Sequence, residues 1–122
     1  MTSSTCIDKL TSYCSALEAL FSTQHGELTH LLAERAAIVI SEHLDDRIAA
    51  YLGVREGYKL RSAYTHGSTY REKDVELTIK MSTKLDSIVR QCLANYFANN
   101  ALATAMQSDK ELDQWFLTKL FS

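Results

Sequence analysis

The chain is short and nearly neutral, and these two properties limit the number of domains it can form and the kinds of ligand it can bind. Its 122 residues match the size of a single domain with one hydrophobic core. A chain of this size buries roughly 65 to 70% of its unfolded surface and folds without metal or disulfide support. Thirteen basic and fifteen acidic residues give a formal net charge of −2. This balance excludes the broad positive field that holds nucleic acids through counterion release, so any RNA contact has to be local.

The cysteines and the N-terminal residues indicate the cellular compartment in which the protein is expected. The three cysteines are an odd number without metal-site spacing, so we expect free thiols in a reducing compartment: Cys6, Cys14 and Cys92. No apolar run reaches the roughly 20 residues of a membrane span, and residues 1–5 lack the basic and apolar regions of a signal peptide. We therefore expect a cytoplasmic protein without a membrane partner.

The first half of the chain predicts three helices. Proline is absent and glycine occurs only four times, so the usual helix breakers are scarce. Apolar residues at three- and four-residue steps predict helices over residues 5–22 and 27–41. Ser41 is a candidate N-cap for a third helix over residues 42–52, which Gly53 would end.

The next segment predicts a fourth, short helix over residues 54–66, closed by Gly67. Gly57 lies inside it at a cost of about 1 kcal/mol relative to alanine. We therefore expect another backbone to pass close to Gly57.

The second half predicts one long helix and a short last one. The longest periodic segment covers residues 73–99 and has the pattern of a central core helix. Ser108 and Glu111 have the spacing of a capping box at the start of a last helix. Residues 1–122 are therefore expected to form one all-α domain, a helical bundle of about five to six helices with one long central helix.

The most specific chemical feature is the run LRSAYTHG at residues 60–67. Arg61 is always charged and can hold a phosphate with two parallel donors, and His66 can transfer a proton near neutral pH. Such a pair could cleave a phosphodiester without metal or cofactor. Five residues set the two side chains roughly 140° apart on a straight helix, so either the helix yields near His66 or a second copy completes the site. The structural alternative is a histidine that complements a helix dipole, and the spacing alone is not specific.

Three segments together resemble the HEPN superfamily, especially its Apea-like branch: LEALF at 17–21, LAERAA at 32–37 and LRSAYTHG at 60–67. The resemblance spans about residues 17–97. It implies an all-helical domain that forms a homodimer through the helix carrying Arg61 and His66, with the two motifs facing each other. Active members of the family are metal-independent endoribonucleases.

The resemblance also implies residue roles. Arg61 would steady the scissile phosphate, and His66 would act as general acid or base while the ribose 2′-hydroxyl attacks, leaving a 2′,3′-cyclic phosphate and a 5′-hydroxyl. Ser62 stands where many active members carry a more strongly polar or charged residue, a departure that bears on activity rather than on fold. The rival interpretation is a catalytically inactive HEPN domain that binds nucleotide, RNA or protein and contributes dimerisation.

The same family implies wider settings. One is a toxin or defence effector with an antitoxin as partner. Another is a domain of a longer protein whose fused domain carries the activity.

Neighbouring side chains are candidates for supporting roles. Glu18 is expected to pair with Arg61 and orient it, although such a pair is as readily a structural tie. Tyr64 could stack on a base, but an aromatic on a short helix more often fills an interface or the core. Three basic residues would give a cleft the positive rim that single-strand binding needs: Arg55, Lys59 and Arg71.

The other histidines, His25, His30 and His43, do not form a metal motif. The spacing of His25 and His30 splays them apart, and no cysteine or aspartate completes a recognisable ligand set. We expect surface or capping histidines, with neither metal nor cofactor.

Overall fold

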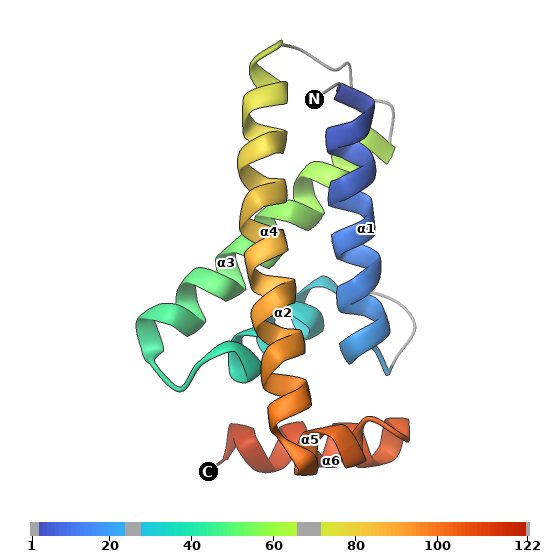
Figure 1. Ribbon diagram of the computed structural model, residues 1–122, viewed down its shortest axis with the longest axis vertical. Helices are drawn as coiled ribbons and strands as arrows, with labels where there is room; N and C mark the ends of the chain where they lie inside the picture. Colours follow the sequence, from blue (N-terminus) through green and yellow to red (C-terminus); the bar gives the residue numbers. More distant parts are fainter. Residues whose placement is uncertain (1–2, 24–27, 66–71, 122) are drawn as a thin grey trace.

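The computed structural model describes residues 3–23, 28–65 and 72–121, and all regular structure in these ranges is α-helical (Figure 1). Six helices follow one another: α1 Ser3–Phe21, α2 Thr29–Ile40, α3 Leu44–Thr65, α4 Glu72–Ala98, α5 Asn100–Ala105 and α6 Asp109–Leu120. The predicted all-α class and helix number are confirmed. Among the described helices, none combines the length and apolar composition that crossing a membrane requires.

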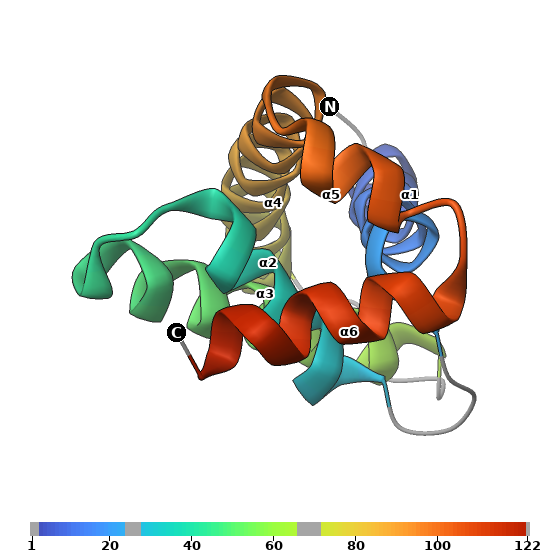
Figure 2. The same cartoon turned by 90° about the horizontal axis from the view of Figure 1, so that it is seen from below.

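The 27-residue helix α4 forms the spine of the molecule, as the sequence predicts for its central helix. It runs alongside α1 and is crossed by α3 (Figure 1). Helices α5 and α6 lie across one end, where α6 contacts α2 (Figure 2). The core between them takes fully or almost fully buried side chains from all six described helices: Leu10 and Leu17 of α1, Leu32 of α2, Val54 of α3, Leu85 of α4, Leu102 of α5 and Phe116 of α6.

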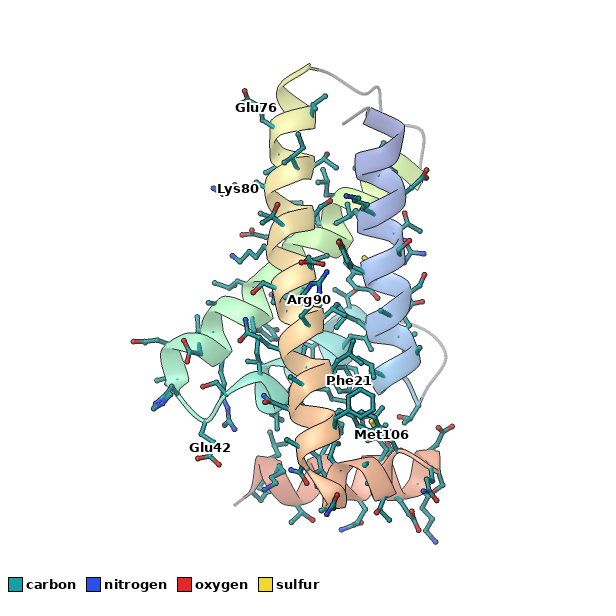
Figure 3. All side chains as sticks on the ribbon, viewed as in Figure 1. Phe21, Glu42, Glu76, Lys80, Arg90 and Met106 are labelled. Atoms are coloured by element: carbon teal, nitrogen blue, oxygen red, sulfur yellow. The ribbon has the colours of Figure 1, made fainter. Side chains whose placement is uncertain are left out.

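The apolar stripe of α1 explains its place in the core. Leu10, Cys14, Leu17 and Phe21 recur at three- and four-residue steps, and all four are buried. Phe21 closes the stripe, with its ring edge-to-face against Phe116 at a centroid distance of 5.8 Å. Figure 3 shows Phe21 directed toward the end of the bundle that also holds Met106. The last turn of α1 is thereby fixed against the C-terminal helices.

The prediction of two separate helices over residues 42–52 and 54–66 was wrong. Helix α3 is one helix of 22 residues, and Gly53 does not end it. Gly53 and Gly57 instead face α4. A Cβ on Gly57 would lie 2.6 Å from Leu85 Cδ1, so the atoms nearest to Gly57 belong to a side chain of α4. The two glycines let α3 and α4 cross closely, and this packing outweighs the cost of glycine within a helix.

Ser41 has a different role from the predicted cap of a helix beginning at Glu42. Helix α3 begins two residues later, at Leu44. The Ser41 hydroxyl accepts a hydrogen bond from the His43 backbone N–H at 3.0 Å and donates one to Asp46 Oδ2 at 3.0 Å. Ser41 therefore organises the turn between α2 and α3.

The C-terminal helices begin at side-chain caps. Ser108 Oγ accepts from the backbone N–H of Glu111 at 3.1 Å, so the predicted start of the last helix is confirmed. Helix α5 was not predicted. The side chain of Asn99 caps its start by accepting from the Leu102 backbone N–H at 3.0 Å, and Asn99 is the one residue between α4 and α5.

Candidate functional site

Arg61 lies near the end of α3, where α3 faces α1. Its Nη1 is 3.3 Å from Glu18 Oε1, so the ion pair expected from the sequence is present. The two side chains are 31% and 35% exposed. The pair is therefore neither sealed in the core nor free in solvent, and its charges remain accessible from one side.

Tyr58 ties this pair to the backbone of α1. Its hydroxyl donates to the Cys14 carbonyl oxygen at 2.9 Å and to Glu18 Oε1 at 3.1 Å. The guanidinium carbon of Arg61 is 5.8 Å from the Tyr58 ring centroid, within the range of a cation–π contact. Glu18 Oε1 thus receives hydrogen bonds from both Tyr58 and Arg61, which fixes the carboxylate and the guanidinium relative to each other.

Burial keeps the Tyr58 hydroxyl and the Cys14 thiol protonated. It raises the pKa of Tyr58 well above its usual range, and the nearby negative charge of Glu18 adds to the effect. Burial likewise raises the pKa of the Cys14 thiol to about 11. Tyr58 is therefore a hydrogen-bond donor at physiological pH, and Cys14 is a packed thiol rather than a nucleophile.

An open groove lies between α2 and α3, with a volume of about 610 Å³. Its lining comes from the first turn of α2 and one face of α3: Thr29, His30, Leu52, Arg55, Glu56, Tyr58, Lys59 and Ser62. Two of the three predicted RNA contacts, Arg55 and Lys59, are thus brought together with Ser62. The side chains of Lys59 and Arg61 point about 200° apart around the helix, and Tyr58 lies between these two directions. Tyr58 therefore separates the groove from the ion pair.

His30 stands at the α2 side of the groove with partners for both ring nitrogens. Nδ1 is 2.8 Å from the Tyr51 hydroxyl, and Nε2 is 3.5 Å from Glu34 Oε2. The His30 side chain is 68% exposed, as expected for a surface histidine, and His43 is also exposed. Within the described ranges, no group of three or more His, Cys, Asp or Glu residues is arranged to hold a metal ion.

Several predicted site residues lie outside this geometry. His66, Gly67 and Arg71 fall outside the described residues, as does His25, and the side chain of Tyr64 is not described. The approach of His66 to Arg61 therefore stays a prediction from the sequence.

Two groove residues of α2 were not predicted as site residues, and neither were the hydrogen bonds that Tyr58 makes. Tyr58 precedes Arg61 by three residues, which puts both on one side of a helix, but its bond to Glu18 depends on how α1 packs against α3. Thr29 and His30 reach the groove only because α2 packs against α3. Their sequence context carries no signal for this, because neither belongs to a motif.

Comparisons with known proteins add no relative. No protein-family model, no curated protein and no solved structure matches the chain.

Proposed function

We propose that this chain is a HEPN-type, metal-independent endoribonuclease that works as a homodimer through Arg61 and His66. One observation carries the proposal. The guanidinium of Arg61 is fixed by Glu18 and flanked by Tyr58, yet about a third of its side chain is exposed. A cation held in this way at the end of a helix, five residues before a histidine, is placed to bind a phosphate brought to the protein surface.

The proposed reaction is an in-line transesterification. The ribose 2′-oxygen attacks phosphorus and gives its proton to a general base, while the bond from phosphorus to the 5′-oxygen breaks and that oxygen takes a proton from a general acid. Arg61 stabilises the charge on the non-bridging oxygens. His66 of one protomer and the partner's His66 would supply the two proton-transfer roles. The products are a 2′,3′-cyclic phosphate and a 5′-hydroxyl.

An exposed apolar stripe on α3 supports the homodimer. Leu44, Ile48 and Leu52 recur at four-residue steps and are 70%, 48% and 46% exposed. Large apolar side chains aligned on a solvent-facing helix mark an interaction surface. The stripe therefore supports the pairing of two copies through α3. Arg61 lies nine residues beyond Leu52, about 180° from it around the helix, so the stripe supports a dimer but does not by itself bring the two motifs together.

The decisive experiment is cleavage of a labelled single-stranded RNA in excess EDTA. Four proteins are compared: the parent, His66→Ala, Arg61→Gln and the matched control Arg90→Gln. Arg90 forms a similar exposed ion pair, with its Nε 2.9 Å from Asp86 Oδ2 on α4. We expect the parent and Arg90→Gln to release cyclic phosphate ends and the other two variants to be inactive. Cleavage that survives in His66→Ala would contradict the assigned site.

A second candidate is a catalytically silent HEPN domain that binds nucleotide, RNA or a protein and contributes dimerisation. The specific observation in its favour is the Glu18 carboxylate, which offsets the charge of Arg61 in a chain whose net charge is already −2. No cleavage from a protein shown to be folded and dimeric would decide for this candidate.

The cellular setting is also part of the proposal. Cys14 and Cys92 are free, buried thiols, which fits the reducing environment of the cytoplasm. The partners proposed there are an antitoxin that neutralises the RNase or a fused domain that directs it. Co-expression with neighbouring gene products, scored by relief of growth arrest, tests the antitoxin.

A further inference from the structure

We propose that the groove between α2 and α3 is a separate RNA-binding subsite, which holds a phosphodiester of the strand away from the phosphate at Arg61. Arg55 and Lys59 provide the contacts. The inference rests on the proposed function for the identity of the ligand, and it adds a second point of attachment on the other side of Tyr58.

The two cations are neighbours on one helical face. Arg55 and Lys59 are one turn apart, about 6 Å along the axis of α3, and both line the groove. The guanidinium carbon of Arg55 lies 5.6 Å from the Tyr51 ring centroid, and stacking of this kind limits the freedom of the side chain. A partly ordered arginine beside a lysine suits a phosphate, because arginine can bind two oxygens at once.

The charge of the groove suits a phosphodiester. Among its lining residues, Arg55 and Lys59 are cationic and Glu56 is the only carboxylate, which leaves one net positive charge. A phosphodiester carries one negative charge. Inorganic phosphate near neutral pH carries more, and Glu56 would oppose it. The positive end of α2, whose first residues Thr29 and His30 line the groove, adds to the attraction.

The distance between the two sites sets the length of RNA that can use both. Arg55 and Arg61 are separated by about 9 Å along the helix axis and by about 120° around it, so 9 Å is the shortest path between them. At about 3.4 Å per stacked nucleotide, a strand held at both points spans at least about two to three nucleotides between them. The groove should therefore raise the affinity for oligonucleotides of four or more nucleotides and leave the affinity for a dinucleotide unchanged.

The test measures binding of a labelled 12-nucleotide 2′-O-methyl RNA by fluorescence anisotropy across a salt series in EDTA. A methylated 2′-oxygen cannot attack, so binding is read without cleavage. The double variant Arg55→Gln/Lys59→Gln is compared with Lys80→Gln/Lys110→Gln, which removes the same charge from exposed lysines of α4 and α6. Lys80 points away from the bundle (Figure 3).

We expect the groove variant to lose affinity on the order of tenfold or more, and the slope of log affinity against log salt to fall by about 0.7, the change for one lost phosphate contact. The control variant should keep both within experimental error. Equal losses in the two variants, or no binding by the parent, would overturn the inference. Displacement of the RNA by inorganic phosphate at constant ionic strength would also overturn it, because the groove would then be a free-phosphate site.

The outcomes separate this inference from the proposed function. If no RNA is cleaved but the methylated RNA binds through the groove, the subsite stands and the ribonuclease proposal fails. If RNA is cleaved with dependence on Arg61 while the groove variant binds and cleaves like the parent, the ribonuclease stands and the subsite fails.

Discussion

Removing one partner or the other of the half-buried Arg35–Asp113 ion pair between α2 and α6 should have unequal effects on stability. The side chain of Arg35 is 6% exposed, whereas that of Asp113 is 45% exposed, and Arg35 Nη2 lies 2.6 Å from Asp113 Oδ1. Arg35 Nη1 also donates to the Phe21 carbonyl oxygen at 2.9 Å. Asp113→Ala therefore leaves a buried cation with neutral acceptors only, whereas Arg35→Met leaves a carboxylate that water already reaches.

Breaking a buried pair costs about 3 to 5 kcal/mol when the remaining charge is buried. We place Asp113→Ala near the lower end, about 3 kcal/mol, because the carbonyl contact persists. Arg35→Met should cost about 1.5 kcal/mol, mainly from the hydrogen bond lost at Phe21. The free energy of unfolding is measured by urea denaturation at pH 7. An equal or larger loss in Arg35→Met would refute the reasoning.

The same pair has a pH signature. A hydrogen bond from Thr23 and then the neighbouring Arg35 hold the pKa of Asp113 below its ordinary value. A carboxyl group with a lower pKa in the folded state stabilises the protein above the unfolded pKa, about 4, and this stabilisation is lost as the pH falls through the folded pKa. The urea midpoint of Asp113→Ala should therefore fall less between pH 5 and pH 2 than that of the parent, with pH values chosen around that pKa.

Three further predictions concern α3. Gly57→Ala should lower the free energy of unfolding by about 1 to 2 kcal/mol, because the new methyl meets Leu85 at 2.6 Å. Gly53→Ala, opposite the flexible end of Lys84 at 3.0 Å, should cost less, and equal losses in the two urea titrations would contradict the packing argument. Ile48→Glu should convert the proposed dimer to a monomer in light scattering, while the control Ile79→Glu on α4 stays dimeric; a dimeric Ile48→Glu would place the interface elsewhere. Tyr58→Phe should slow the proposed RNA cleavage several-fold by freeing Glu18, and an unchanged rate would show that the hydroxyl does not position Arg61.

Local signals in the sequence located most helices. The apolar stripe of α1 and the cap at Ser108 were predicted because each depends on residues a few positions apart. The end predicted at Gly53 was wrong because the closeness of α4, which favours glycine there, is invisible in the local sequence. A glycine between two helical stretches has the same local pattern whether it ends a helix or admits a neighbour.

In the candidate site, too, some features were predicted from the sequence and others depend on how the helices pack. The Glu18–Arg61 pair was expected through the resemblance to a family, which carries tertiary information that spacing lacks. The sequence predicts Arg55 and Lys59 as cations near the motif, and their four-residue spacing places them on one face of the helix. Their position opposite the first turn of α2 required the packing of two helices, and so did the link from Tyr58 to Cys14 and Glu18.

Because α3 is one continuous helix, it fixes the distances between the features of the proposed enzyme. The apolar stripe, the groove cations and Arg61 all lie on this helix, so their spacing and relative direction are set by the helical pitch rather than by a loop. Inserting one residue between Leu52 and Arg55 would turn everything beyond it by about 100° and advance it by about 1.5 Å. A single substitution along this helix therefore changes only its own contacts, while a change in the length of the helix displaces all three features relative to one another.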